Sequence, residues 1–519
     1  MGILLDFQSN LDWLSKQSED VVSFFHGIEK EGLRTEASGK IADNSHPQAL
    51  GSTLTHPSIT TDYSESLLEF ITPVFKKPKD AIEHLTQLHQ FSYQHLGEQT
   101  IWPASMPNFV PNELAINIAQ YGSSNIGQLK TAYRHGLWHR YGRMMQAIAG
   151  LHFNFSFSDD FWKAFSEHKG NTEDMQSFIS RQYFHLIRGF RRHSWLLLYL
   201  FGASPALDKS FKTGEQVKLE TLSEDTDFLP MATSLRMSDI GYSNNAQSSL
   251  NICYNTLENY TASLSKAIKT IYPKYQKIGL KDGDQAKQLN ENILQIENEY
   301  YSDIRPKRVA NSGEKPIAAL RDRGVQYIEV RCLDLNPFMP CGIDESQMKF
   351  LDVFLTYCLL SEQDKIDDIE CEEVAENTKR VTQRGRDQNL TLLIDNVETP
   401  LIKQAETIFK SLNDIADVVE NFETGTKEAI QQQFKKVHDN KYTPSYLLLK
   451  HISAHQGSFL KAGQSLANEH KAYFQKLDLP EVTQKAFNQL SEQSIIDQKE
   501  IESTDNVSFD VFLKEYLNG

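Results

Sequence analysis

LHFNFSF, residues 151–157, alternates strictly between apolar and polar side chains. Successive side chains of a β-strand point to opposite faces, so this stretch predicts a strand with one aromatic face. The opposite face then carries His152, Asn154 and Ser156. The aromatic face needs a cover, whereas the polar face is either exposed to solvent or the floor of a binding site.

Two further stretches have the same period of two. In GIEKEGL, residues 27–33, Glu29 and Glu31 lie on one face. In QYIEVR, residues 326–331, Glu329 shares one side with the arginine two positions later, and two β-branched residues lie opposite. Three polar strand faces that carry carboxylates, an imidazole and a guanidinium therefore indicate one charged surface.

Around these strands, apolar residues recur at helical spacing. The pattern predicts amphipathic helices over residues 1–25, 80–96, 127–149 and 173–199, and mostly helix beyond residue 398. Helices interspersed with alternating strands are typical of an α+β fold, in which helices pack on the apolar face of a largely antiparallel sheet.

The composition narrows the function classes. The 519 residues include 53 basic and 69 acidic side chains, a formal net charge of −16. Such a chain lacks the basic surface of a general nucleic-acid binder and is not attracted to anionic membranes. Its most apolar run, residues 195–203, is far shorter than the roughly 20 residues that a bilayer requires. The five cysteines form no CxxC pair and no signal peptide precedes them, so we expect a cytoplasmic protein with reduced thiols.

Carboxylates in apolar or β-prone surroundings are the main chemical signal. Glu29, Glu31, Glu69 and Glu329 are of this kind, and Asp62 lies in a more polar stretch. Each one alone is typical of a surface or ion-paired carboxylate. Several in one cavity would repel one another, and Mg²⁺ or Mn²⁺ would relieve that repulsion by accepting their hard oxygen ligands.

His152 and three arginines could complete such a site. A lone strand histidine is typical of a structural residue, but it could also bind the metal or a phosphate. Arg236, Arg305 and Arg331 lie beside apolar or small residues, and a guanidinium matches the oxygens of carboxylates and phosphates. Together these groups suggest phosphoryl transfer, in which catalysis is positioning and charge neutralisation. The sequence has no P-loop and no GxGxxG, so ATP would bind a non-standard site.

Longer stretches resemble a known enzyme family. They include HGIEKEGLR (26–34), HPQALGSTLTHPSITTDYSESLLEFITP (46–73), AQYGSSNIGQLKTAYRHGL (119–137), ATSLRMSDIGYSN (232–244) and YIEVRCLDLNPF (327–338). The chain resembles bacterial glutamate–cysteine ligase, also called γ-glutamylcysteine synthetase, of the gammaproteobacterial type. The resemblance is dense from about residue 26 to residue 340.

The resemblance implies a glutamine-synthetase-like fold, with a curved, mainly antiparallel sheet that is covered by helices and forms a funnel-shaped site. We expect a single ligase domain over residues 1–519, with all site residues within 26–340 and a mostly helical buttress over 398–519. The implied reaction joins the γ-carboxylate of L-glutamate to the amine of L-cysteine, using ATP, through γ-glutamyl phosphate. This is the first step of glutathione biosynthesis.

The resemblance also implies cofactors, partners and site residues. Mg²⁺ or Mn²⁺ is the implied metal and ATP the co-substrate, and we expect a monomer without a nucleic-acid or membrane partner. The family's metal ligands map onto Glu29, Glu31, Asp62, Glu69, His152 and Glu329. Its catalytic residues map onto Glu329 and Arg331. Its cysteine pocket maps onto Tyr63, Tyr133, Leu137, Gln146, Arg236, Tyr242 and Tyr301.

Two alternatives stay open at this point. One is a related carboxylate–amine ligase of the same fold that uses another amine. The other is a catalytically inactive homologue that acts as a binding module. The complete set of acids, imidazole and arginines favours an active enzyme.

Overall fold

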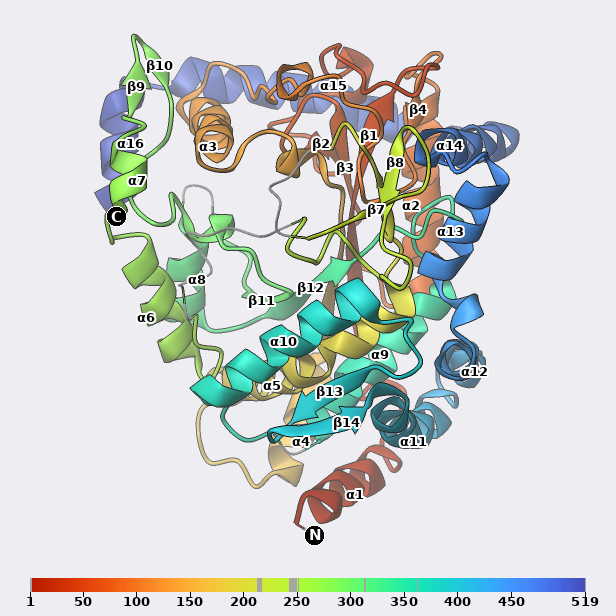
Figure 1. Ribbon diagram of the computed structural model, residues 1–519. Helices are drawn as coiled ribbons and strands as arrows, with labels where there is room; N and C mark the ends of the chain where they lie inside the picture. The colour runs from red at the N-terminus through yellow and green to blue at the C-terminus, as the bar shows by residue number, and fades with distance from the viewer. Residues whose placement is uncertain are drawn as a thin grey trace.

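Seven strands form an open sheet through the middle of the molecule (Figure 1). Hydrogen-bonded neighbours follow the order β11-β12-β5-β1-β3-β2, and β4 pairs with β1. All pairings between these strands are antiparallel. The strands are β1 (Phe24–Thr35), β2 (Ile59–Thr61), β3 (Leu67–Ile71), β4 (Thr100–Ile101), β5 (Leu151–Phe157), β11 (Ile304–Lys307) and β12 (Tyr327–Leu333).

The computed structural model describes most of the chain. The described residues are 2–211, 217–241, 250, 252–311, 314–361 and 363–518, with side chains from residue 6 onward. Among the helices of these residues, none combines the length and the apolar character that crossing a membrane would take.

Short strands and many helices surround the central sheet. The smaller strands are β6 (Ala206–Asp208), β7 (Glu220–Thr221), β8 (Thr226–Phe228), β9 (Lys281–Asp282), β10 (Gln285–Ala286), β13 (Thr391–Ile394) and β14 (Val397–Pro400). The helices up to residue 360 are α1 (Gly2–Leu14), α2 (Pro78–Tyr93), α3 (Asn125–Tyr141), α4 (Asp159–His168), α5 (Met175–Phe201), α6 (Leu257–Ala267), α7 (Pro273–Gln276), α8 (Pro316–Arg323) and α9 (Glu345–Leu360). The later helices are α10 (Asp368–Arg384), α11 (Leu401–Val419), α12 (Thr426–His438), α13 (Pro444–Ala454), α14 (Phe459–Lys476), α15 (Glu481–Thr504) and α16 (Phe509–Asn518).

One face of the sheet is apolar and covered by helices. Ile28, Phe153 and Val330 lie side by side in β1, β5 and β12, and each is fully buried. Helices α2 and α5 pack against this face. Helix α9 is tied to it by a buried ion pair between His26 Nε2 and Asp352 Oδ1, 2.9 Å apart. The other face of the same strands carries the acidic side chains, so covering the back of the sheet leaves that face for a site.

The predicted α+β class, with a mainly antiparallel sheet covered by helices, is confirmed. The three strands predicted from their period of two are β1, β5 and β12. Helices predicted over 80–96 and 173–199 are α2 and α5, displaced by a few residues.

Two predicted helices are too long. The helix predicted over residues 1–25 ends at Leu14, and β1 begins at Phe24. Between them the Ser18 carbonyl accepts hydrogen bonds from two successive valine amides, and these valines precede aromatic residues that fit a strand better than a helix. The helix predicted over 127–149 ends at Tyr141, because Gly142 has a φ of 81° and terminates it.

Helices α11 to α14 lie along one side of the molecule, on the right in Figure 1. Helices α11 and α12 pack together and against α9, whereas α14 packs on α2. Helix α15 runs across the end of the molecule, and α16 then reaches α3. The last helix of the chain therefore lies next to a helix of the N-terminal part.

Candidate active site

A cavity of about 560 Å³ lies on the polar face of the central sheet. Its walls come from β1, β3, β5, β11 and β12, from α3 and from α16. Every predicted site residue that the structure describes lines it: Glu29, Glu31, Asp62, Tyr63, Glu69, Tyr133, Leu137, Gln146, His152, Arg236, Tyr301, Glu329 and Arg331. Tyr242, the remaining predicted residue, lies outside the described residues.

The strand register explains why the acidic side chains converge. Glu29 on β1 is paired with His152 on β5, and Glu31 is paired with Glu69 on β3. Directly opposite residues of adjacent antiparallel strands project to the same face, with their Cβ atoms about 4.5–5.5 Å apart. Glu329 on β12 is paired with an asparagine of β5 in the neighbouring row. Four sequence segments thus deliver their charges to one surface.

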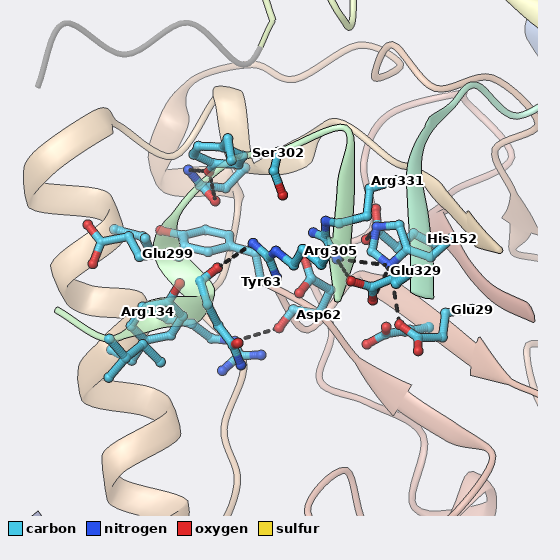
Figure 2. Close-up of a pocket in the computed structure, with 18 of the residues that line it drawn as sticks. Glu29, Asp62, Tyr63, Arg134, His152, Glu299, Ser302, Arg305, Glu329 and Arg331 are labelled. Carbon is cyan, nitrogen blue, oxygen red and sulfur yellow. Dashed lines mark hydrogen bonds and ion pairs between the residues drawn. The ribbon is translucent and has the colours of Figure 1, made fainter. Parts of the chain in front are cut away.

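Glu29, His152 and Glu329 form the first acidic group (Figure 2). One ligand atom from each lies within 4.8 Å of the others. His152 Nδ1 is 3.2 Å from Glu29 Oε2 and 3.8 Å from Glu329 Oε1. Two carboxylates and an imidazole around one point are donors that suit Mg²⁺ or Mn²⁺.

Basic neighbours keep the carboxylates of the first group ionised. Burial alone would raise the pKa of Glu329, but Lys307, Arg331 and His152 outweigh it and hold that pKa well below the usual range. Burial also opposes ionisation of Glu29, yet its hydrogen bond with His152 leaves the pKa lowered. Burial and Arg331 lower the pKa of His152. The imidazole is therefore neutral near pH 7 and has a lone pair to offer.

Glu31, Asp62 and Glu69 form a second acidic group in the same cavity. Burial raises the pKa of Glu31 to about 8, and the charge of Asp62 adds to the effect. Burial, together with Asp62, raises the pKa of Glu69 well above its usual value. Carboxylates that cannot all ionise side by side take up protons or a cation near neutral pH, so this group also fits a divalent metal.

Basic side chains adjoin the first acidic group (Figure 2). Arg331 Nη1 is 3.1 Å from Glu329 Oε2 and 3.4 Å from His152 Nδ1. Lys307 Nζ is 3.3 Å from the other oxygen of Glu329. Arg305 lies opposite Glu329 in the strand pairing and lines the cavity too. Three cations beside metal-binding donors make this end suited to phosphate groups.

The other end of the cavity is lined by tyrosines and apolar side chains, with Arg134 and Glu299 beside them (Figure 2). Tyr133 and Leu137 reach it from α3, and Gln146 Nε2 donates a hydrogen bond to the Tyr301 hydroxyl oxygen at 3.1 Å. The hydroxyl of Tyr63, whose ring is buried, has no hydrogen-bond partner among the described residues. Apolar walls with a few polar groups suit a small amino-acid side chain.

Arg236 lies in the cavity wall and also anchors the end of β12. Its Nη1 donates to the Leu333 carbonyl at 3.1 Å and its Nη2 donates to the Arg331 carbonyl at 2.9 Å. Gly150 lies against the same guanidinium, and a Cβ there would be 2.4 Å from Arg236 Nη2. Any contact of Arg236 with a substrate would therefore depend on a glycine at position 150.

Several lining residues were not predicted as site residues. Lys130 and Arg134 flank Tyr133 on α3, inside a stretch that carries the family resemblance, and Arg134 Nε donates to the Asp62 carbonyl at 2.5 Å. Lys307 lies two residues after Arg305 in β11, so the strand period could have found it. Tyr516 comes from α16, beyond the resembling stretches, and no sequence signal pointed to it.

Comparison with known proteins identifies the family. The model of the glutamate–cysteine ligase family matches residues 11–381 of this chain. The chain is 47% identical over 509 residues to the glutamate–cysteine ligase of Hahella chejuensis, and the match covers 97% of both chains. The chain belongs to the glutamate–cysteine ligase family. This confirms the resemblance that the sequence motifs indicated.

A second relative and two solved structures agree with this assignment. The ligase is 47% identical over 493 residues to the glutamate–cysteine ligase of Pseudomonas putida, covering 95% of this chain and 94% of that one. The crystal structure of glutamate–cysteine ligase from Francisella tularensis in complex with AMP matches with a TM-score of 0.90 and 36% identity, over 96% of this chain and 98% of the other. A bifunctional glutathione synthetase from Pasteurella multocida matches with a TM-score of 0.73 and 25% identity, over 94% of this chain and 58% of that one. The ligase thus has the fold of these enzymes.

Proposed function

We propose that this ligase joins the γ-carboxylate of L-glutamate to the amine of L-cysteine, using ATP, by way of γ-glutamyl phosphate. The product γ-L-glutamyl-L-cysteine is the first intermediate of glutathione biosynthesis. One observation carries the residue-level proposal: the cavity joins metal-binding and phosphate-binding groups at one end to a tyrosine-lined end. Family membership supports L-glutamate and L-cysteine as substrates. The AMP bound to the Francisella tularensis enzyme supports an adenine nucleotide as the co-substrate.

The donors for a divalent cation are the two acidic groups. Glu29, His152 and Glu329 would hold one site, and Glu31, Asp62 and Glu69 would contribute the remaining oxygen ligands. Bound Mg²⁺ or Mn²⁺ would supply positive charge to the phosphate oxygens of ATP. The raised pKa values of Glu31 and Glu69 support this assignment, because they mark a place where added positive charge is favourable.

In the first step an oxygen of the glutamate γ-carboxylate attacks the γ-phosphorus of ATP. The bond between that phosphorus and the bridging oxygen breaks, which gives γ-glutamyl phosphate and ADP. Arg331, with Lys307 and Arg305 beside it, stabilises the charge on the transferring group. Holding the reactants in line can lower the barrier by about 7–11 kcal/mol.

In the second step the cysteine amine attacks the acyl carbon of γ-glutamyl phosphate. The bond from this carbon to the phosphate oxygen breaks, and the nitrogen loses its extra proton as the amide forms. The residues proposed to hold cysteine are Tyr63, Tyr133, Leu137, Gln146, Arg236 and Tyr301. Tyr242 stays in this set on the family resemblance alone.

ADP release with a panel of amines tests the proposed function. We expect release that requires glutamate, a divalent cation and an amine, with L-cysteine the best amine. A pocket with apolar walls distinguishes near-isosteres by only about 1–3 kcal/mol, so 2-aminobutyrate should be used and glycine should be poor. Rejection of 2-aminobutyrate by more than about a thousandfold would require a direct thiol contact that the pocket lacks.

The same panel separates the alternatives. Faster turnover with a different amine would make this chain another carboxylate–amine ligase. Absence of ADP release with every amine would make it an inactive homologue.

The raised pKa of Glu31 leads to a prediction of how pH changes the stabilisation of the folded chain by a divalent cation. Burial raises the pKa of Glu31 from 4.5 to about 8 in the metal-free chain. Because the folded state holds this proton more tightly, its stabilising contribution is complete below pH 4.5 and is lost as the pH rises through 8. A cation binds the ionised carboxylate. The increase in melting temperature on replacing EDTA with Mg²⁺ should therefore be larger at pH 8.5 than at pH 6.

Glu31→Gln is the matched variant for this comparison, because it cannot titrate. Its Mg²⁺-dependent increase in melting temperature should change less between the two pH values than that of the wild type. Equal pH dependence in both proteins would rule out Glu31 as the group that couples protons to metal binding.

The proposal extends to the whole chain. We propose one ligase domain over residues 1–519, in which the helices beyond residue 398 buttress the catalytic part, and a monomeric enzyme. The five cysteines are free thiols, as expected in a reducing compartment, and a cytoplasmic location is proposed on that ground.

A further inference from the structure

The C-terminal helix α16 is attached to the molecule differently from the other C-terminal helices. No residue of α16 is fully buried, whereas α11 to α15 each bury several. Its apolar side chains join a small hydrophobic cluster with Leu129, Ala132 and Leu289, separate from the main core. An exposed segment, residues 505–508, connects it to α15. This helix is therefore attached through few buried contacts, and its displacement would leave the main core intact.

Polar contacts hold α16 and its connecting segment over α3. The Asp505 carboxylate accepts a hydrogen bond from the backbone amide of Asn125, at the first turn of α3. Asp510 Oδ1 is 2.5 Å from Lys281 Nζ, on the β9–β10 hairpin. Both side chains are solvent-exposed, 43% for Lys281 and 64% for Asp510, so the pair contributes little to stability.

Tyr516 connects this helix to the cavity. It lines the same cavity as the acidic groups and the tyrosines. Like Tyr133, which is assigned to the cysteine pocket, it packs against the small cluster, and its ring lies 6.2 Å from that of Phe512 one turn earlier. Lys315, the residue just before α8, places its Nζ 5.4 Å from the centre of the Tyr516 ring. Tyr516 is thus the residue through which the last helix reaches the cavity.

We propose that Tyr516 is a specificity-determining residue for the amine substrate, and that α16 is the lid that carries it. This inference rests on the proposed function. The lid has a chemical purpose, because the acyl carbon of γ-glutamyl phosphate reacts with water as well as with an amine. Attack by water breaks the same carbon–oxygen bond and returns glutamate and phosphate, so ATP is consumed without product. A closed aromatic end excludes that water and holds the amine.

Tyr516→Ala tests the proposal in the full-length chain. We expect the KM for cysteine to rise about tenfold or more, while the KM for ATP changes less than about twofold. We also expect the ratio of ADP formed to γ-glutamylcysteine formed to rise above one, because water enters in place of the amine. Tyr516→Phe keeps the ring and should retain both values.

Val511→Ala is the control on the same helix, since Val511 is 45% exposed and is not among the residues of the small cluster. It should leave the KM for cysteine and the coupling ratio unchanged. A Tyr516→Ala enzyme with the wild-type KM for cysteine and one ADP per product would overturn the proposal. The wild-type assay separates the two levels of inference, because failure of the proposed function would leave it without γ-glutamylcysteine.

Hydrogen exchange of the wild-type enzyme gives a second test that depends on no substitution. Bound glutamate, 2-aminobutyrate and a non-hydrolysable ATP analogue should slow exchange of the amides of residues 509–518. Unchanged exchange of these amides, alongside slowed exchange in β1 and β5, would show that substrates bind without involving the lid and would contradict the proposal.

Discussion

Glu329→Gln is expected to lower kcat by at least about a hundredfold while the chain stays folded. Glu329 is the most enclosed member of the first acidic group, 1% exposed, with Lys307 on one oxygen and Arg331 on the other. The amide has nearly the same shape, but it loses the charge and one acceptor. The site then has fewer donors for a cation, and Lys307 and Arg331 lose the carboxylate with which both form ion pairs.

Two measurements separate loss of metal binding from general damage. The affinity for Mn²⁺, followed by its electron paramagnetic resonance signal, should fall together with kcat. Glu98→Gln, an exposed change at the turn after α2, should alter neither quantity. Near wild-type turnover of Glu329→Gln across a Mg²⁺ titration would refute the assignment of Glu329 as a ligand.

Arg331→Lys should have the second large effect, a fall in kcat of about a thousandfold. Arg331 is held in place by Glu329 and contacts His152, so its guanidinium has a fixed direction toward the cavity. Lysine keeps the charge but presents one compact ammonium in place of a planar fork, which cannot bind two phosphate oxygens at once. The charge that develops in phosphoryl transfer would lose a directed partner.

The pattern of kinetic constants identifies the role of Arg331. A group that acts on the transferring phosphoryl lowers kcat, whereas one that only binds glutamate raises its KM and leaves kcat unchanged. Arg384→Lys, at an exposed arginine of α10, is the control and should be neutral. If Arg331→Lys raised only the KM for glutamate and left kcat unchanged, the role of Arg331 would be substrate binding and not catalysis.

The sequence alone predicts the strands in which polar and apolar side chains alternate at a period of two. Alternation in β1, β5 and β12 is enough to place Glu29, His152 and Glu329 on one polar face, because a strand allows only two faces. The register that brings Glu29 opposite His152 depends on strand pairing, which no single segment contains. The family resemblance grouped these residues into one site, but it did not give the register.

The features that the sequence does not predict are set by tertiary contacts. The high pKa of Glu31 comes from burial and from Asp62, which lies 31 residues away and approaches only after folding. Tyr516 reaches the cavity because the final helix returns to α3, more than 360 residues earlier in the chain. Helix α1 ends at Leu14, and a separate turn follows at Ser18, although the apolar spacing of residues 1–25 is helical throughout.

The central claim is that glutamate is activated by phosphorylation before the amine attacks. A free carboxylate is a poor acylating agent, because its negative charge repels the amine and oxide is a poor leaving group. Among the described residues that line the cavity there is no cysteine, the hydroxyl of Ser302 has no hydrogen-bond partner, and Lys307 is held in an ion pair with Glu329, so none of these groups is arranged as an activated nucleophile. One oxygen of the γ-carboxylate should therefore leave with phosphate.

Transfer of heavy oxygen tests this claim most directly. L-Glutamate labelled with ¹⁸O in both γ-carboxyl positions is incubated with ATP, L-cysteine, Mg²⁺ and the wild-type enzyme, and the inorganic phosphate is analysed by mass spectrometry. We predict one labelled oxygen in phosphate for each γ-glutamylcysteine formed. Unlabelled phosphate alongside authentic γ-glutamylcysteine would mean that ATP is cleaved elsewhere, and it would contradict the roles proposed for Arg331 and the two acidic groups.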